Sequence, residues 1–357
     1  MPHSSRVAVV IPCRNEAQSV LELLAELPRQ DHPLAEVIVV DNASTDGTSE
    51  AVQEFSRSHP DYPLRLIRCK RIGQPAALNA GIRAAEADVI VRMDAHARPA
   101  PSYVRLGVET LRDLTVGVAG GVWEIVPGRP TLVAEAIARA VSHPMGAGDA
   151  AYRGGRTMQE PRAVDTVPFG CFLKAAWQEL GGFNERVLTN EDYEFNYRIR
   201  QSGRRVVLDP RIRSRYFARP TITALAEQYF RYGWWKAQML RAHPKSLRWR
   251  QAVPAGFVAT VAGLSLLATG LLVSGVRLPA MLTAMALAGL LIAYGAALLY
   301  AAWRICGGRR SWRMLPVLPM AFATIHGCWG GGVLVNLLTF SRWPLRFSRL
   351  ASATRTE

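Results

Sequence analysis

The chain has 357 residues, with 43 Lys and Arg against 28 Asp and Glu, so its formal net charge is +15. This length allows one large domain or two ordinary ones, each with a buried core. Five cysteines lie far apart without a Cys-x-x-Cys pair, so the sequence indicates neither a disulfide framework nor a zinc site and fits a reducing compartment.

Four short runs rich in Val and Ile predict buried parallel strands in the first hundred residues. The runs are VAVVIP at 7–12, EVIVVD at 36–41, LRLIRC at 64–69 and DVIVRM at 88–93. Helical patterns at 16–27, 47–58 and 74–86 separate them. This alternation predicts an α/β fold with a doubly wound, mostly parallel sheet. Ligands of such sheets bind outside the carboxyl ends of the strands, where polar loops follow all four runs.

The loop DNASTDGT at 41–48 places two carboxylates and several hydroxyls before a helix. One interpretation is a turn with a helix cap provided by Asp46 or Ser44. Asp41 favours the other interpretation, because a carboxylate at the end of a strand can accept hydrogen bonds from a base or a ribose in the crevice. The Gly-x-Gly-x-x-Gly and Walker motifs of dinucleotide and NTP sites are absent from the sequence.

Asp94 and His96 follow the fourth run, in VIVRMDAHARP at 89–99. On an extended chain alternate side chains point to the same side, so the carboxylate and the imidazole would both face a cation. One hard oxygen and one nitrogen suit Mn²⁺ or Mg²⁺ whose shell is completed by phosphate oxygens. The alternative is an Asp that caps a helix beginning near Pro101, beside an incidental surface His.

Two later stretches of the sequence predict a loop and a helix. Residues 145–162 contain several Gly and Arg and no periodicity, which predicts a mobile loop. The segment LGGFNERVLTNEDYEFNYRIRQSG at 180–203 predicts an amphipathic helix that opens with Glu191 and Asp192. Acidic residues in a first turn ordinarily complement the helix dipole. Two adjacent acids after a Gly-Gly-Phe turn are less usual than a single acidic residue in a first turn.

Three apolar stretches, at 252–274, 279–303 and 315–340, approach the ~20 residues that cross a bilayer. Basic residues gather before the first and between the second and third, whereas the loop between the first two contains only Arg277. The positive-inside rule therefore places the large N-terminal region in the cytosol. Three full crossings would place the basic tail outside, so either the rule fails there or the third stretch is interrupted and turns back or lies at the interface, which is the course expected here and keeps the tail cytosolic. The interrupting residues are Pro316, Pro319, His326 and the glycines at 330–332.

The positive charge by itself suits either nucleic acid or an anionic membrane surface. Because the basic residues gather at the ends of the apolar stretches, the pattern favours a lipid bilayer as partner and no nucleic acid. The short apolar run at 7–12 is too short for a signal peptide and is interpreted as the first strand.

The chain resembles family 2 glycosyltransferases with the GT-A fold. The motifs that carry the resemblance are VVIPCRNEAQSV, VIVVDNASTDGT, GQPAALNAGI, VRMDAHARP, GCFLKAAWQELGGFNER with NEDYEFNYRIRQSG, and QYFRYGWWK, over residues 6–240. The DAH form and the membrane tail are most similar to the subgroup that makes bacterial exopolysaccharides such as succinoglycan. The resemblance implies a glycosyltransferase domain at 1–240, and the apolar stretches with their basic flanks predict a membrane region at 241–357.

The resemblance also implies roles for single residues. Asp94 and His96 fall on the Asp-x-Asp metal motif, with His96 in place of the second aspartate, and Asp192 falls on the catalytic base, with Glu191 as its orienting or capping neighbour. The residues implied around the sugar nucleotide are Pro12, Asn15, Glu16, Asp41 and Asn42, with Gln74 and Asn79 nearby. Gln228 and Arg231 match the Gln-x-x-Arg-Trp motif of processive synthases, with Tyr232 in place of Trp. An interfacial helix is the alternative for that segment.

The expected function is that of a membrane-anchored, inverting glycosyltransferase at the cytoplasmic face of the inner membrane. It would move a sugar from a nucleoside diphosphate to a lipid-linked or membrane-proximal acceptor in exopolysaccharide or envelope glycan synthesis. Once a divalent metal neutralises the diphosphate, one carboxylate suffices to deprotonate the acceptor hydroxyl. The alternatives are a polyprenyl-phosphate sugar synthase, whose acceptor is already ionised, and a non-catalytic nucleotide-binding scaffold or transporter.

Overall fold

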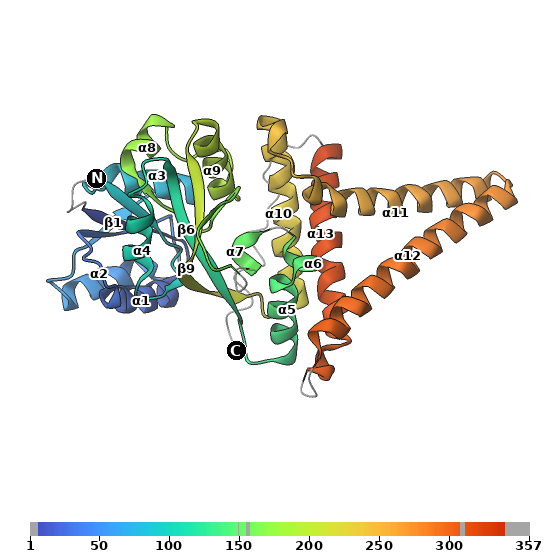
Figure 1. Cartoon of the computed structure of the whole chain (residues 1–357), viewed down its shortest axis with the longest axis horizontal. Helices are drawn as coiled ribbons and strands as arrows, with labels where there is room; N and C mark the ends of the chain where they lie inside the picture. Colours follow the sequence, from blue (N-terminus) through green and yellow to red (C-terminus); the bar gives the residue numbers. More distant parts are fainter. Residues whose placement is uncertain (1–5, 149, 155–157, 308–310, 340–357) are drawn as a thin grey trace.

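The computed structural model describes residues 6–148, 150–154, 158–307 and 311–339. An α/β body is followed by long helices, two of which project away from it (Figure 1). The body contains one sheet with the strand order β3-β2-β1-β4-β8-β6-β9-β5, and β7 pairs with β9 beside this path.

The four predicted strands form the parallel half of the sheet. Their bounds are β1 (Val7–Cys13), β2 (Glu36–Asp41), β3 (Leu64–Arg68) and β4 (Val89–Arg92). The pairs β1–β2, β1–β4 and β2–β3 are all parallel. Every residue of β2 and β4 is buried, as expected for strands covered by helices on both faces. The prediction of these strands is confirmed to within one residue at each end.

Helices alternate with these strands and cover the sheet. The first ones are α1 (Ala17–Glu26), with the 3₁₀ turn Leu27–Arg29 after it, α2 (Thr48–Ser58), α3 (Gln74–Ala84) and α4 (Tyr103–Thr110). Apolar side chains pack in two clusters on the two faces of the sheet, one against α1 and α4 and the other against α3. The three predicted helices at 16–27, 47–58 and 74–86 are therefore confirmed.

The second half of the sheet is mixed. Its strands are β5 (Arg98–Pro99), β6 (Val116–Pro127), β7 (Arg162–Ala163), β8 (Cys171–Leu173) and β9 (Arg205–Ala218). β8 is antiparallel to both β4 and β6, whereas β6 and β9 run parallel to each other. The helices of this half are α5 (Leu132–Ser142), α6 (Pro144–Ala147), α7 (Ala151–Gly154), α8 (Lys174–Glu179) and α9 (Glu191–Gln201). The predicted doubly wound sheet is thus continued by a mixed extension.

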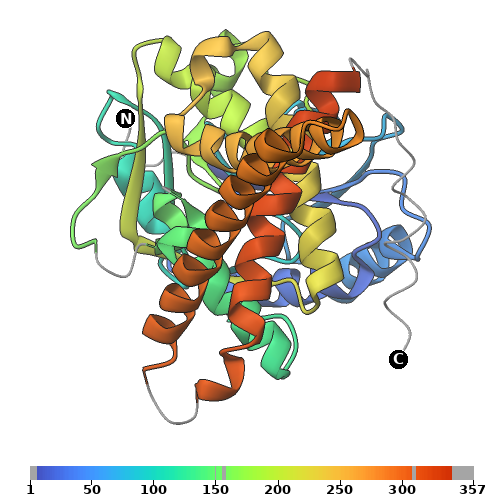
Figure 2. The same ribbon diagram turned by 90° about the vertical axis from the view of Figure 1, so that its right-hand side faces the viewer.

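Two helices, α10 (Ile222–Ala242) and α13 (Val317–Thr339), lie side by side (Figures 1 and 2). Glycines on both helices allow the close approach. A Cβ on Gly233 would lie 2.1 Å from the carbonyl oxygen of Trp329, and a Cβ on Gly332 would lie 2.2 Å from that of Phe230. Because any side chain would collide with backbone at these positions, the two helices can pack this closely only through glycine.

Three helices are long and apolar enough to cross a membrane: α11 (Trp249–Val273), α12 (Arg277–Ile305) and α13. Short 3₁₀ turns, Pro244–Ser246 and Trp312–Met314, precede α11 and α13. Figure 1 shows α11 and α12 as a hairpin that projects from the body, and Figure 2 looks onto it with α12 in front of α13. Within the most apolar 18-residue window of each helix, 0% of the residues of α11 are buried, compared with 39% of the residues of α13.

The predicted interruption of the third apolar stretch is wrong, because α13 is one continuous helix. Pro319 lies in its first turn, where a missing backbone N–H breaks no helical hydrogen bond. The glycines serve close packing: a Cβ on Gly330 would lie 2.4 Å from the carbonyl oxygen of Pro254 in α11. The predicted cytosolic tail after Phe340 lies outside the described residues.

Candidate active site

The loops after β1 and β2 hold each other at one edge of the sheet. The backbone N–H of Thr45 donates to Asn15 Oδ1 over 2.8 Å, and the N–H of Asn15 donates to Ser44 Oγ over 3.0 Å. The carboxylate of Asp46 accepts from the N–H groups of Ala17 and Thr48, so it joins the starts of α1 and α2. Parallel pairing of β1 and β2 brings these loops together.

Asp41 and Asn42 are buried at the end of β2, where they bind neighbouring loops. Asp41 accepts from the hydroxyl of Ser49 over 2.8 Å. Asn42 donates to the carbonyl of Arg71 over 2.7 Å and accepts from the N–H of Gly73 over 2.7 Å. The contacts of Asn42 fix the loop that leads to Gln74, the first residue of α3, and the contact of Asp41 holds the start of α2, so both residues shape the edge of the crevice.

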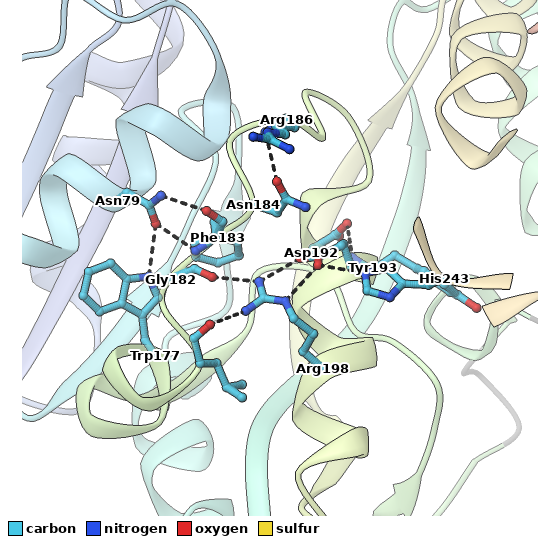
Figure 3. A network of polar contacts seen from close by, with 12 residues as sticks. Asn79, Trp177, Gly182, Phe183, Asn184, Arg186, Asp192, Tyr193, Arg198 and His243 are labelled. Atoms are coloured by element: carbon cyan, nitrogen blue, oxygen red, sulfur yellow. Dashed lines mark hydrogen bonds and ion pairs between the residues drawn. The ribbon is translucent and has the colours of Figure 1, made fainter. Parts of the chain in front are cut away.

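The amide of Asn79 is engaged by the Gly-Gly-Phe turn before α9 (Figure 3). It accepts from the N–H of Phe183 over 2.8 Å and from Trp177 Nε1 over 3.2 Å. It donates to the carbonyl of Phe183 and to Glu185, each over 2.9 Å. Asn79 therefore acts on the site by holding this turn in place.

Arg198 holds the same turn from α9 (Figure 3). Its guanidinium donates to the carbonyls of Leu180 and Gly182, each over 2.7 Å, and pairs with the buried Glu194. Glu194 also contacts His243 Nε2 at 3.2 Å, which ties α9 to the end of α10. The start of α9, with Glu191 and Asp192, is thus fixed from two sides.

The buried guanidinium of Arg92, at the end of β4, joins the acidic residues. It donates to Asp94 over 2.9 Å and to Glu191 over 2.8 Å, and it lies 3.8 Å from Asp192. Burial raises the pKa of both Glu191 and Asp192, although the charge of Arg92 lowers it. Three carboxylates around one guanidinium leave an excess of negative charge, so the site favours a further cation or protonation of a carboxylate.

Asp94 and His96 do not lie on extended chain as the sequence argument assumed. They belong to a turn in which the N–H of Ala97 donates to the carbonyl of Asp94 over 2.8 Å. Asp94 accepts from Gln74 Nε2 over 2.7 Å, whereas His96 Nδ1 lies 3.5 Å from Glu16. Among the described residues no group of three His, Cys, Asp or Glu side chains could hold a metal ion. A metal here would need ligands from the substrate.

Positive backbone φ angles in non-glycine residues gather around this site. They occur at Asn15 (57°), Ala43 (56°), Phe169 (48°) and Asn190 (65°), in the described part of the chain. A left-handed conformation is costly for a bulky residue such as Phe169, whose carbonyl accepts from Tyr103 over 2.7 Å. Its ring lies 5.8 Å from the guanidinium carbon of Arg92. Such strain persists mostly where surrounding contacts enforce it, and functional sites are the usual place.

A cavity of about 590 Å³ connects the acidic residues with the apolar helices. Residues at its acidic end are Gln74, Arg92, Asp94, Glu191 and Asp192. Its middle is lined by Trp123, Tyr152, Arg153, Phe169, Tyr229 and Tyr232. Its far end is lined by Pro254 and Phe257 of α11, Tyr294 of α12, and His326 and Trp329 of α13.

The cavity brings together Gln74, Asp94, Glu191 and Asp192 out of the predicted site residues. The others lie outside its lining: Pro12, Asn15, Glu16, Asp41, Asn42, Asn79, His96, Gln228 and Arg231. Gln228 is buried and donates to the hydroxyls of Tyr216 and Tyr232 over 2.9 and 3.0 Å, so it supports a lining residue. Arg231 is exposed on α10.

The sequence reasoning missed Arg92, Trp123, Arg153 and Phe169. A charge within the apolar run VIVRM was a signal for Arg92. Arg153 lies within the stretch predicted as a mobile loop, where the structure has the short helices α6 and α7. Without periodicity in that stretch, nothing in the sequence distinguished Arg153 from the other arginines.

Residues 8–169 match the sequence family described as Glycosyl transferase family 2. The chain is 29% identical over 346 residues to the succinoglycan biosynthesis protein ExoA of Rhizobium meliloti, covering 95% of this chain and 97% of the relative. It is 26% identical over 276 residues, 75% of this chain and 83% of the relative, to a dolichyl N-acetyl-alpha-D-glucosaminyl phosphate 3-beta-D-2,3-diacetamido-2,3-dideoxy-beta-D-glucuronosyltransferase of Methanococcus voltae.

The fold is also similar to that of a solved enzyme. This is the mannosyltransferase PcManGT of Pyrobaculum calidifontis in complex with GDP-Man and Mn²⁺, with a TM-score of 0.60 and 24% sequence identity. The likeness covers 95% of this chain and 89% of that one. At this level of identity it concerns the fold alone.

Proposed function

We propose that the chain, whose residues 8–169 match glycosyltransferase family 2, is an inverting glycosyltransferase that uses a nucleoside-diphosphate sugar and a lipid-linked or membrane-proximal acceptor. One observation carries the proposal. The cavity that begins at Asp94, Glu191 and Asp192 continues to the helices α11, α12 and α13. An acceptor anchored in a bilayer can therefore reach the acidic residues from the membrane side.

Asp192 is the proposed general base. It lies in the first turn of α9 and lines the cavity, and burial raises the pKa of its carboxyl group. A raised pKa makes a carboxylate a stronger base toward an acceptor hydroxyl. Glu191 is paired with Arg92, which supports an orienting role. A retaining double displacement would need a second carboxylate as nucleophile, and the pairing of both Glu191 and Asp94 with Arg92 supports inversion instead.

The donor diphosphate is proposed to lie at the carboxyl ends of β1, β2 and β4, with Asp94 and His96 as the residues that would hold a divalent cation. The excess of carboxylates over guanidinium at Arg92 fits an additional cation. A bound Mn²⁺ or Mg²⁺ would neutralise charge on the departing diphosphate. Pro12, Asn15, Glu16, Asp41 and Asn42 remain the proposed surroundings of the nucleoside.

We propose a multi-pass protein of the inner membrane with a cytoplasmic catalytic domain. With 25 residues, α11 is about 37 Å long, enough for a hydrocarbon layer of roughly 30 Å. The α11–α12 hairpin would cross and return, with Gly275 at its outer tip. α13 packs against α10 and is more buried than α11, which supports a course along the membrane surface.

A panel of nucleoside-diphosphate sugars tests the reaction. Membranes that contain the protein are incubated with each radiolabelled donor, with Mn²⁺ or Mg²⁺, and label in the organic extract is compared with that from Asp192→Asn membranes. We expect one donor to give label that depends on the metal and on Asp192. Label that needs neither Asp192 nor a hydroxyl acceptor would instead indicate transfer to an ionised polyprenyl phosphate.

A further inference from the structure

Arg153 of α7 is enclosed by aromatic rings in the middle of the cavity. Its guanidinium carbon lies 5.5 Å from the ring centre of Trp123, 5.6 Å from that of Tyr152 and 6.0 Å from that of Tyr229. Its Nη1 donates to the hydroxyl of Tyr229 over 2.8 Å. Within the described residues no carboxylate lies within 4 Å of Arg153. Arg153, Trp123, Tyr152 and Tyr229 are called the aromatic box below.

Two donors in this aromatic box lack an acceptor. Arg153 Nε and Trp123 Nε1 are both buried and have no hydrogen-bond partner among the described residues. Cation–π contacts explain why a guanidinium can rest among rings. The N–H groups of Arg153 Nε and Trp123 Nε1 nevertheless remain without an acceptor. A buried donor without an acceptor is unfavourable unless a ligand supplies acceptor oxygens. A cation with two free donors matches an anion with several oxygens, such as a phosphate.

The position of the aromatic box separates it from the carboxylates. The ring of Phe169 lies 5.7 Å from that of Trp123 and also contacts Arg92, so two rings stand between Arg153 and the acidic end. On its other side, the box adjoins the apolar helices. α7 packs on α6, and His326 of α13 bonds the carbonyl of Met145 in α6 at 2.7 Å.

Other charged side chains that line the cavity contact partners outside the aromatic box. Arg92 pairs with Asp94, Glu191 and Asp192, and Asp165 lies 3.7 Å from Arg248. Lys236 donates to the carbonyl of Ser246 over 3.2 Å and lies over the ring of Tyr193. Arg250, in the first turn of α11, also lines the cavity. Within the described part of the chain, Arg153 contacts the rings of Trp123, Tyr152 and Tyr229 and the hydroxyl of Tyr229.

We propose that Arg153 and Trp123 bind the phosphate that links the acceptor saccharide to its lipid. The inference rests on the proposed function. The lipid would leave the box along α11 and α13, and the saccharide would extend past Phe169 toward Asp192. The proposed site of the donor diphosphate is at the strand ends beside Asp94. We therefore assign the aromatic box to the phosphate of the acceptor. It makes the enzyme selective for phosphate-linked lipid acceptors over neutral glycolipids.

Binding of defined probes tests this assignment on the full chain in detergent micelles. The probes are a polyprenyl phosphate, the matching polyprenol, and UDP or GDP with Mn²⁺, and their affinities are measured by isothermal titration calorimetry. We expect the wild-type protein to bind the polyprenyl phosphate more tightly than the polyprenol. Arg153→Gln should weaken phosphate binding roughly tenfold or more, the scale of lost hydrogen bonds to a charged group, and leave polyprenol and nucleotide binding unchanged.

Further variants keep the test decisive if Arg153→Gln fails to fold, which its thermal midpoint reports. Arg153→Lys keeps the charge without the forked donors, and Trp123→Phe removes one N–H and keeps a ring. Both should weaken polyprenyl-phosphate binding severalfold. Arg112→Gln, an exposed arginine at the end of α4, is the matched control and should bind every probe as the wild type does.

The outcomes separate this inference from the proposed function. Unchanged polyprenyl-phosphate affinity in folded Arg153→Gln or in Trp123→Phe overturns the inference. Loss of nucleotide binding in place of lipid binding also overturns it, because the box would then hold the donor diphosphate. Failure of the wild-type protein to transfer sugar from any donor, with preferential polyprenyl-phosphate binding retained, would contradict the proposed function and leave the phosphate assignment standing.

Discussion

Arg92 donates to Glu191 over 2.8 Å although the two residues are 99 positions apart in the chain. The contact joins the end of β4 to the start of α9, both of them buried. It therefore determines where the first turn of α9 stands relative to Asp94. The acidic end of the cavity depends on this one guanidinium.

Removing Arg92 should destabilise the protein strongly. Arg92→Met leaves Glu191 and Asp94 without their buried partner, which typically costs about 3–5 kcal/mol. For a chain of this size we expect the thermal midpoint in detergent to fall by about 10 °C. Adding Glu191→Gln should restore part of the loss, because one buried charge is then removed. A midpoint equal to that of the control Arg112→Met would show that the ion pair contributes little.

Asp192→Asn keeps the shape of the side chain and removes its basicity. With saturating donor and acceptor, turnover should fall by about a hundredfold or more, the usual scale for loss of a general base. Affinity for the sugar nucleotide should remain within a few-fold of the wild-type value, measured by calorimetry. An unchanged turnover number would mean that the acceptor arrives ionised, and a polyprenyl-phosphate sugar synthase would then be the better explanation.

Asp94→Ala and His96→Ala should both reduce metal-dependent transfer, with Asp94→Ala the more severe. Asp94 lies among Arg92 and Gln74 at the acidic end of the cavity, whereas His96 is half exposed beside Glu16. Titration of Mn²⁺ against initial rate gives the apparent metal affinity of each variant. Wild-type rate and metal affinity in His96→Ala would remove His96 from the proposed metal site.

Neighbouring glycines in α13 should respond differently to the same change. Gly332→Ala places a Cβ against the carbonyl of Phe230, and overpacking of this kind costs about 1–3 kcal/mol. Gly331→Ala meets no atom within 4 Å and should leave stability unchanged or improve it, because alanine favours a helix. The thermal midpoints of the two variants in detergent compare these effects directly. Equal midpoints would contradict the close packing of α10 and α13.

Cysteine labelling from outside intact cells tests the topology. The five native cysteines, Cys13, Cys69, Cys171, Cys306 and Cys328, are first replaced by Ala, and single cysteines are then introduced at Gly275, Ser311 and Ser352. A membrane-impermeant maleimide should label the protein at position 275 and should label positions 311 and 352 only after permeabilisation. Labelling of position 352 in intact cells would mean that α13 crosses the bilayer fully and carries the tail outside.

Local patterns in the sequence were enough to predict the elements around which the site is built. Val and Ile runs separated by periodic helices identify β1 to β4 and α1 to α3, because buried parallel strands require apolar side chains on both faces. Length and apolar content alone likewise located α11, α12 and α13. The order of the polar motifs pointed to Gln74, Asp94, Glu191 and Asp192, all of which line the cavity.

The tertiary structure determined which surfaces contact each other, and the roles of single residues depend on those contacts. The glycines at 330–332 suggested a break in the helix, but Gly332 lies against the backbone of α10 and Gly330 against that of α11, so they allow a continuous helix to pack closely. Asn79 and Gln228 carry polar groups suited to a ligand, yet their partners lie within the chain itself. Arg153 gains its aromatic surroundings from β6, α7 and α10, which lie far apart in sequence. Contacts across such separations depend on packing of the whole chain, so no local pattern records them.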